Sequence, residues 1–197
     1  MNSSQAIAAR TLDGPVSGAA GKALLVAFGI ALLTLSAKIQ VPFWPVPMTL
    51  QTIAIMGIAA AYGSRLAVAT VVAYLGAGAA GLPVFAGPIA GPAYLMGPTA
   101  GFLAGFVIIA AIVGWAADRG YAEKPFRLMG SMLVADIICF ALGFTWLAFF
   151  FVSSKTGNTL GAEVAFNAGI KPYILGDLVK IGLATASVAA IARFARK

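Results

Sequence analysis

Charged residues are scarce in this sequence, and histidine is absent. Only 10% of the 197 residues are charged, against about 25% in an average soluble domain. The missing histidine removes the commonest metal ligand and the commonest general base. The single cysteine, Cys139, allows no disulfide within the chain and no paired-cysteine motif for metal or redox chemistry. The composition therefore argues against an enzyme, and no metal or cofactor is expected.

Apolar residues take the place of the missing charges. Hydrophobic residues make up 61% of the chain, and the mean hydropathy is +0.97. A soluble core of this size cannot hide so much apolar surface, so the composition predicts an all-α integral membrane protein. The formal net charge of +7 does not indicate nucleic-acid binding, because the basic residues stand singly or in small groups between apolar runs.

Six apolar runs approach or reach the roughly 20 residues that a membrane-spanning helix needs. They are separated by turn-forming or charged segments such as VPFWPVP, YGSR and DRGYAEKP. The sequence thus predicts six transmembrane helices in one bundle, preceded by a flexible cytoplasmic tail at 1–21. The membrane domain covers 22–197, with helices at about 22–40, 47–63, 65–81, 98–117, 127–151 and 171–194.

Lysine and arginine fall unevenly on the two sides of this bundle. With a cytoplasmic N-terminus, nine basic residues lie on the cytoplasmic side and three on the other, while Lys180 stays within the membrane. Cytoplasmic loops carry the excess of basic residues, so the N- and C-termini are both predicted to be cytoplasmic. We expect a multi-pass protein of the inner (plasma) membrane.

One external loop has no charge at all. The segment GLPVFAGPIAGPAYLMGP contains four glycines and four prolines. An apolar loop of this kind is not expected to extend into water. It is expected to fold back over the bundle, either as a lid over a ligand site or as filler that contacts no ligand.

The last apolar run contains two opposite charges, Asp177 and Lys180. They share one helix face and lie roughly 9 and 13 Å from the start of the helix. A charge at the centre of a membrane helix costs about 2.5–3.5 kcal/mol, which a partner or a water-filled cavity offsets. The pair either braces the bundle or faces an external cavity and binds a ligand. Since an ionised aspartate only accepts hydrogen bonds and a lysine only donates them, an amide, urea or lactam would satisfy both.

Asp136 is a second acidic residue within an apolar run. Four roles are open for it at this point. It could pair with Lys180, join a polar network, face a water defect or contact a ligand directly.

The first apolar run carries a stripe of small residues. Ala23, Ala27 and Ala31 follow one another at steps of four. Such a stripe lets another helix approach closely. The other helix could belong to the same bundle or to a partner protein.

Four strings along the chain resemble the BioY family, the biotin-specific substrate-binding subunits of energy-coupling-factor (ECF) transporters. The strings are VPFWPVPMTLQT, YLGAGAAGLPVFAGP, YLMGPTAGFLAGF and PYILGDLVKI, and the similarity covers about residues 22 to 194. The resemblance implies a six-helix bundle that captures biotin from outside and hydrolyses no ATP itself. The membrane coupling subunit and the ATPase subunits would be separate proteins, and the alanine stripe would dock on the coupling subunit. Consistently, the chain has no phosphate-binding loop of the GxxxxGKS or GxxxxGKT type.

The resemblance also implies which residues bind biotin. The aspartate and lysine of the family's last helix contact the ureido ring, and they match Asp177 and Lys180. Gln51 and Tyr74 fall in matching stretches and are expected to line the pocket. Four aromatic residues are expected to cover the bicyclic ring and the acyl chain: Phe43, Trp44, Phe85 and Tyr94. The segment AGPIAGPAY lacks the basic residue that some relatives carry for the biotin carboxylate, so backbone N–H groups, Tyr94 or solvent are all open as its partner.

Two other classes of protein are open alternatives. A self-sufficient transporter of biotin or another small molecule would work without ATPase partners. It would favour internal repeats and helices broken near the midplane, and the two halves of the chain show no clear repeat. A membrane-embedded enzyme would need a nucleophile beside Asp177 and Lys180, and none accompanies them.

Overall fold

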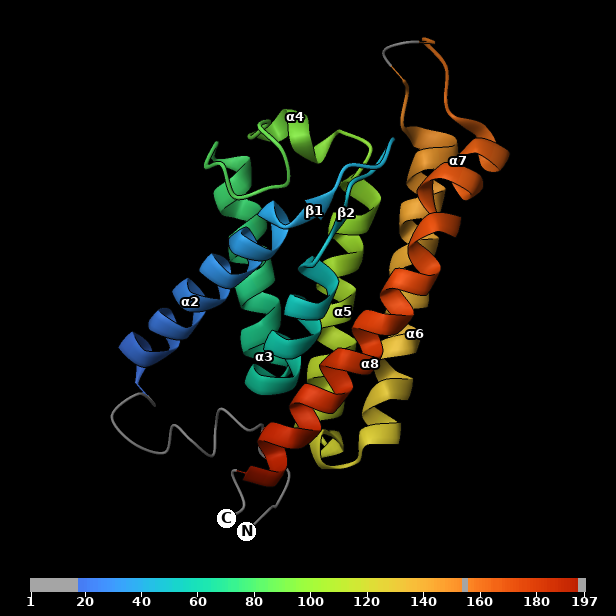
Figure 1. Cartoon of the computed structure of the whole chain (residues 1–197). Helices are drawn as coiled ribbons and strands as arrows, with labels where there is room; N and C mark the ends of the chain where they lie inside the picture. The colour runs from blue at the N-terminus through green and yellow to red at the C-terminus, as the bar shows by residue number, and fades with distance from the viewer. Residues whose placement is uncertain (1–17, 154–155, 195–197) are drawn as a thin grey trace.

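The computed structural model describes residues 18–153 and 156–194. Its long helices run lengthwise through the molecule, and most of the short elements gather at one end (Figure 1). Within the described residues, five helical segments are long and apolar enough to cross a membrane. They are built from α2 (Ala19–Lys38), α3 (Gln51–Ala79), α5 (Ala100–Asp118), α6 (Pro125–Thr145) with its π-helical extension η2 (Trp146–Phe150), and α8 (Lys171–Phe194) with the helix before it.

Helix α3 is folded back on itself at Gly63. This residue has φ 76° and ψ 172°, a conformation that is essentially restricted to glycine. In a straight helix Gln51 and Tyr74 would lie roughly 35 Å apart, yet the Gln51 amide nitrogen donates to the Tyr74 hydroxyl at 2.9 Å. The two halves of α3 are therefore antiparallel, as Figure 1 also shows. They correspond to the second and third apolar runs, and the fold lies in the YGSR segment.

Short elements cover the upper end of the bundle in Figure 1. The antiparallel strands β1 (Gln40–Val41) and β2 (Met48–Thr49) connect α2 to α3. Helix α4 (Pro92–Leu95) lies in the loop between α3 and α5, and α7 (Gly161–Gly169) precedes α8. The 3-10 turn η1 (Tyr121–Glu123) connects α5 to α6 at the opposite end. Helix α8 also ends there, and the first residues of α2 lie on the same side.

The observed helix bounds differ from most of the predicted ones by a few residues. The last predicted run, 171–194, coincides with α8, but the second run begins at Gln51 and not at 47. The difference arises because Pro45 and Pro47 interrupt a helix and Met48–Thr49 pairs as β2. The short helices α4 and α7 were not predicted, since neither is long enough to form an apolar run of its own. Most of the predicted tail at 1–21 lies outside the described residues, and α2 already begins at Ala19.

Helix α2 packs chiefly on α3 and stands at the side of the bundle. Its buried positions, Gly29 and Leu33 among them, face α3, while most of the remaining surface is exposed. Ala23, Ala27 and Ala31 all lie on the exposed part. The alanine stripe therefore does not pack within the described bundle, which removes one of its two interpretations.

Candidate functional site

Asp177 and Lys180 lie on a buried face of α8, with 6% and 8% of their surface exposed. The Lys180 ammonium donates to Asp177 Oδ1 at 2.5 Å and to the backbone oxygen of Thr49 at 2.7 Å. The Thr52 hydroxyl donates to the same Asp177 oxygen at 3.3 Å. The pair thus joins α8 to β2 and to the start of α3. Within the described residues, one Lys180 N–H and Asp177 Oδ2 still have no hydrogen-bond partner.

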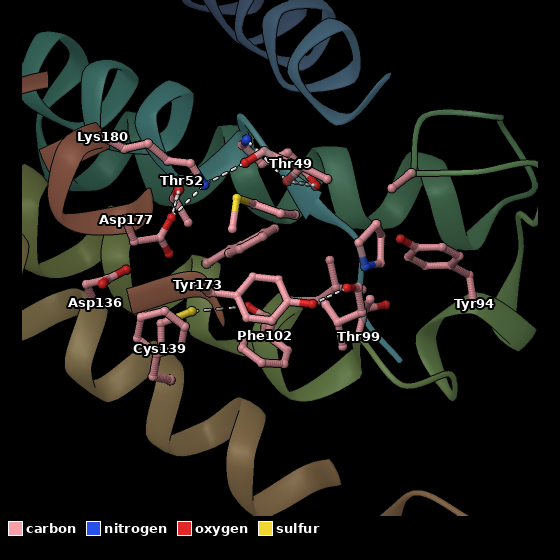
Figure 2. A pocket seen from close by; sticks show the side chains of 18 residues that line it. Thr49, Thr52, Tyr94, Thr99, Phe102, Asp136, Cys139, Tyr173, Asp177 and Lys180 are labelled. Carbon is pink, nitrogen blue, oxygen red and sulfur yellow. Dashed lines mark hydrogen bonds and ion pairs between the residues drawn. The ribbon is translucent and has the colours of Figure 1, made fainter. Parts of the chain in front are cut away.

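An open cavity of about 570 Å³, counting the part that opens to solvent, lies beside this pair (Figure 2). Strand β2 with the residues before it, the four long helices α3, α5, α6 and α8, and the loop between α3 and α5 all contribute to its walls. The lining residues are Val46, Pro47, Met48, Thr49, Gln51, Thr52, Ala86, Tyr94, Thr99, Phe102, Leu103, Phe106, Asp136, Cys139, Phe140, Tyr173, Asp177 and Lys180.

A second carboxyl group lines the same end of the cavity. Asp136 on α6 is 7% exposed, and Figure 2 places it next to Asp177 and Lys180. It forms no hydrogen bond or ion pair with any residue that the structure describes. Direct pairing with Lys180, one of the roles considered for Asp136, is therefore absent. The Lys180 ammonium therefore pairs with Asp177 alone, and a buried polar group without a partner, such as the Asp136 carboxyl, is costly unless a ligand or water completes it.

Aromatic side chains form the middle of the cavity wall. Phe102 on α5 and Phe140 on α6 meet edge to face, with ring centroids 6.3 Å apart. Tyr173 on α8 also lines the cavity, and its hydroxyl donates to the backbone oxygen of Val46. The cavity is thus apolar in the middle and polar at the end formed by Asp136, Asp177 and Lys180, the arrangement typical of sites for ligands with a polar head and an apolar body.

Gln51 forms part of the cavity lining, and two hydrogen bonds to neighbouring side chains hold its amide group in place. Its Nε2 donates to the Tyr74 hydroxyl at 2.9 Å, and its Oε1 accepts from the Thr49 hydroxyl at 3.2 Å. The Tyr74 hydroxyl in turn donates to the backbone oxygen of Val84 at 3.0 Å. These bonds connect the cavity lining to the loop that follows α3.

The loop between α3 and α5 folds back over the bundle and reaches the cavity through Ala86 and Tyr94. The Phe85 ring stacks on Tyr94 with centroids 4.4 Å apart. It also fills the space over Gly78, where an added Cβ would lie only 2.0 Å from the ring. At the end of α2, the Lys38 ammonium donates to the backbone oxygens of Phe85 at 2.7 Å and Gly87 at 3.3 Å. Several contacts therefore hold this loop against the bundle.

Two hydroxyl groups occupy the other end of the cavity, opposite the charged residues in Figure 2. Burial raises the pKa of the Tyr94 phenol, so Tyr94 stays a neutral hydroxyl at physiological pH. The Thr99 hydroxyl is buried and has no hydrogen-bond partner among the described residues. This end offers hydrogen-bonding groups without a charge.

The structure brings four of the eight expected ligand-binding residues to the cavity: Gln51, Tyr94, Asp177 and Lys180. The other four lie elsewhere. Tyr74 and Phe85 are buried behind the lining, each with 1% of its surface exposed. Phe43 and Trp44, in the connection between β1 and β2, are 42% and 56% exposed. The Phe43 ring packs edge to face on Tyr173, with centroids 5.8 Å apart, and so reaches the cavity only through a neighbour.

Several lining residues were missed by sequence reasoning. Thr49 contributes its backbone oxygen, which accepts from Lys180. Thr52 bonds to Asp177, which lies 125 positions away in the sequence. Neither contact leaves a pattern in the sequence. Tyr173 could have been found from the sequence, because it precedes Asp177 by four residues and so shares its helix face.

Among the described residues, no group of three or more His, Cys, Asp or Glu side chains is placed to hold a metal ion.

This chain is similar to known proteins over most of its length. Residues 6–197 match the model of the BioY family. The probable biotin transporter BioY of Pyrococcus horikoshii is 34% identical over 160 residues, which cover 81% of this chain and 89% of that protein. The biotin transporter BioY of Thermotoga maritima is 33% identical over 155 residues, covering 78% and 85%. The fold matches the crystal structure of the S-component for biotin from an ECF-type ABC transporter, with a TM-score of 0.71, 23% identity and coverage of 88% and 92%.

Proposed function

The chain belongs to the BioY family, and on this premise we propose that it captures biotin from outside the cell as the substrate-binding subunit of an ATP-driven ECF-type vitamin importer. Its relatives carry the names of transporters and not of enzymes. ATP hydrolysis is assigned to separate partner subunits, because the chain contains no phosphate-binding loop of its own.

The observation that carries the proposal is the pairing of Asp177 with Lys180 beside an open cavity. Each of the two groups keeps bonding capacity that the described residues do not use: one N–H on the ammonium and Oδ2 on the carboxylate. A urea presents a C=O flanked by N–H groups. The C=O accepts from Lys180 and one N–H donates to Asp177, so the ureido ring of biotin complements both residues.

The polarity of the cavity supports an orientation for the rest of biotin. With the ureido ring at Asp177 and Lys180, the bicyclic body lies against Phe102, Phe140 and Tyr173. The acyl chain then points toward Tyr94 and Thr99. Lys180 is the one cation among the residues lining the cavity, so we assign the carboxylate to neutral hydroxyl groups and solvent at that end.

Tyr74, Phe85, Phe43 and Trp44 receive supporting roles in this proposal. Tyr74 orients Gln51, and Phe85 positions Tyr94. Phe43 packs on Tyr173, and Trp44 lies beside it in the same strand connection. These four residues are assigned to holding the lining in place, while direct contact with biotin is assigned to Asp177, Lys180, Gln51 and Tyr94.

The same proposal includes six crossings of the inner (plasma) membrane, with both termini in the cytoplasm. The two antiparallel halves of α3 count as separate crossings, each shorter than the roughly 20 residues of a straight span. The upper-end elements in Figure 1 then lie outside the cell. Charge distribution supports this orientation, because Arg65, Arg119 and Arg127 all lie in or beside the connections at the opposite end.

We assign the exposed alanine stripe of α2 to docking on the membrane coupling subunit. Ala23, Ala27 and Ala31 are exposed on a helix whose other side packs on α3. Small side chains in this arrangement allow a second helix to approach closely within the bilayer. The coupling subunit and its ATPases are thus expected to approach from the side of α2.

Two measurements test the proposed function. The purified chain in detergent should bind labelled biotin without ATP, and an unrelated vitamin of similar size should not compete. Absence of saturable binding would refute biotin capture. The chain alone in liposomes should bind biotin but not accumulate it, and sustained gradient-driven accumulation would identify a self-sufficient transporter instead.

A further inference from the structure

Cationic and aromatic side chains contact one another around η1, at the end of the bundle opposite β1 and β2 (Figure 1). The Arg119 guanidinium carbon lies 3.7 Å from the centre of the Trp115 ring. The Trp115 and Tyr121 rings meet edge to face with centroids 6.3 Å apart, and the Arg127 guanidinium carbon lies 5.8 Å from the centre of the Tyr121 ring. A cation within about 6 Å of a ring centroid is attracted to the ring. These four residues are called the η1 corner below.

Both guanidinium groups of the η1 corner keep their capacity for hydrogen bonds. Arg119 and Arg127 are exposed, and neither side chain forms a hydrogen bond or an ion pair with any residue in 18–153 or 156–194. A guanidinium group carries five N–H donors in a planar fork that matches the oxygens of a phosphate. The η1 corner therefore presents two such forks to an anion.

The nearest acidic residues in the sequence are engaged elsewhere. Asp118 accepts from the Ser64 N–H at 3.0 Å and from the Ser64 hydroxyl at 2.6 Å. Glu123 lines a separate cavity together with Arg193, near the end of α8. Neither carboxylate forms an ion pair with a guanidinium group of the η1 corner. The corner therefore keeps its two positive charges.

An exposed apolar face of α6 begins beside the η1 corner. Phe126, Val134 and Ile137 are all largely exposed, and their spacing places them on one side of the helix. In a membrane protein such a face contacts acyl chains, whereas tryptophan and tyrosine gather at the level of the lipid headgroups. The η1 corner thus lies where a headgroup meets its acyl chains.

We propose that the η1 corner binds the phosphate-bearing headgroup of an anionic phospholipid whose acyl chains lie along the exposed face of α6. Arg119 and Arg127 donate to the phosphate oxygens, and Trp115 and Tyr121 hold the two guanidinium groups at headgroup level. Two cations favour a lipid with net negative charge over a zwitterionic one. In the orientation proposed above, this lipid belongs to the cytoplasmic leaflet. The inference goes beyond the proposed function, because it requires no biotin.

Quenching of tryptophan fluorescence by brominated lipids tests the proposal, because Trp115 belongs to the η1 corner. The purified chain is reconstituted at low salt into phosphatidylcholine vesicles that contain a minor fraction of a lipid with dibrominated acyl chains. This lipid is either phosphatidylglycerol or phosphatidylcholine, and it is present in both leaflets, so the direction of insertion does not matter. We expect phosphatidylglycerol to be enriched about fivefold or more beside Trp115, since one basic residue near an anionic surface contributes roughly this factor. It should therefore quench more strongly than phosphatidylcholine.

Variants assign the extra quenching to the η1 corner. Arg119→Gln combined with Arg127→Gln should remove most of the extra quenching by phosphatidylglycerol, while thermal unfolding stays like wild type because both residues are exposed. Arg65→Gln is the matched control and should keep the extra quenching. Arg65 is also an exposed arginine at this end of the bundle, but it contacts no aromatic ring among the described residues. Trp44 and Trp146 lie toward the other end and contribute the same background to every variant.

Three results would overturn the proposal. Equal quenching by the two lipids in the wild-type chain would leave the η1 corner to a protein partner. Equal loss of the extra quenching in Arg65→Gln would indicate diffuse attraction by net charge. Sodium phosphate should weaken the extra quenching no more than sodium chloride of the same ionic strength, and a stronger effect would identify a site for a soluble anion. Biotin titration of the same chain tests the proposed function separately.

Discussion

Gln51 and Tyr74 belong to one helix, stand 23 positions apart and are joined by a hydrogen bond of 2.9 Å across the fold at Gly63. The Tyr74 hydroxyl continues to the backbone oxygen of Val84 at 3.0 Å. One phenol therefore connects the two halves of α3, a cavity-lining amide and the loop that covers the cavity. These two hydrogen bonds fix the two short halves of α3 relative to each other and to the loop, and so keep the cavity lining in position.

Tyr74→Phe should destabilise the fold and weaken biotin binding. The variant leaves a buried amide N–H of Gln51 and the Val84 carbonyl without a partner, at a cost of about 1–3 kcal/mol. Thermal unfolding in detergent and a biotin titration measure the two effects. Tyr62→Phe is the matched control, because the Tyr62 hydroxyl donates to Leu25 at 3.0 Å away from the cavity and its loss should leave biotin affinity unchanged. Wild-type stability and affinity in Tyr74→Phe would contradict the connecting role.

Gly63→Ala should lower stability by about 1–3 kcal/mol, the usual cost of holding a residue with a side chain in such a backbone conformation. The fold at Gly63 is stabilised by Asp118, which accepts from the Ser64 N–H at 3.0 Å and from its hydroxyl at 2.6 Å. Gly57→Ala is the control, because Gly57 is helical and an added Cβ there contacts nothing within 4 Å. Thermal unfolding should shift for Gly63→Ala alone, and equal shifts would show that the fold does not depend on glycine.

Lys38→Met should speed the release of bound biotin. The Lys38 ammonium holds the loop over the cavity through the carbonyl oxygens of Phe85 and Gly87, and a charged hydrogen bond of this kind contributes roughly 1.5–3 kcal/mol at most. We therefore expect a several-fold faster dissociation of labelled biotin with the fold intact. Lys22→Met, at the other end of α2, serves as the control. A dissociation rate equal to that of wild type would mean that this loop does not gate release.

The parts of the site that could be predicted from the sequence are those whose residue type is unusual for its surroundings. Asp177 and Lys180 were recognisable because charges are rare within an apolar helix. Thr49 contributes only a backbone oxygen, which no side chain in the sequence indicates. Phe43 and Trp44 were expected at the ligand because they are aromatic, but the connection between β1 and β2 leaves both largely exposed. Hydropathy located the long helices, whereas the strands, α4 and α7 depend on packing against those helices and leave little periodic signal.

Asp177→Asn and Lys180→Met should each reduce biotin affinity by about 1–3 kcal/mol or more. Each substitution removes a ligand contact and leaves the other member of the pair buried without its counter-charge. The double variant should lose less than the sum of the two single losses, because the pair acts as a unit. Biotin titration measures all three. Lys171→Met, at the exposed start of α8, should bind like wild type.

If both single variants bind biotin as tightly as wild type, the ligand does not occupy this end of the cavity. Additive losses would have a different meaning. They would indicate that Asp177 and Lys180 contact the ligand independently and that their own 2.5 Å contact contributes little. Thermal unfolding of each variant distinguishes a lost contact from a damaged fold.

Ala27→Trp should separate binding from transport. The indole would project from the middle of the exposed alanine stripe on α2 and prevent close approach of a partner helix. The cavity lies among α3, α5, α6 and α8, so biotin affinity of the purified chain should be unchanged. Uptake of labelled biotin in cells that supply the coupling and ATPase subunits should fall sharply.

Leu32→Trp provides the matched control for this prediction, since it adds the same indole to the same helix. Residue 32 is also exposed, but it stands one residue beyond Ala31 and therefore about 100° around the helix axis from the stripe. It should support normal uptake if docking uses the stripe. Equal loss of uptake in both variants would indicate a broader contact surface on α2, and normal uptake in Ala27→Trp would exclude the stripe as the docking surface.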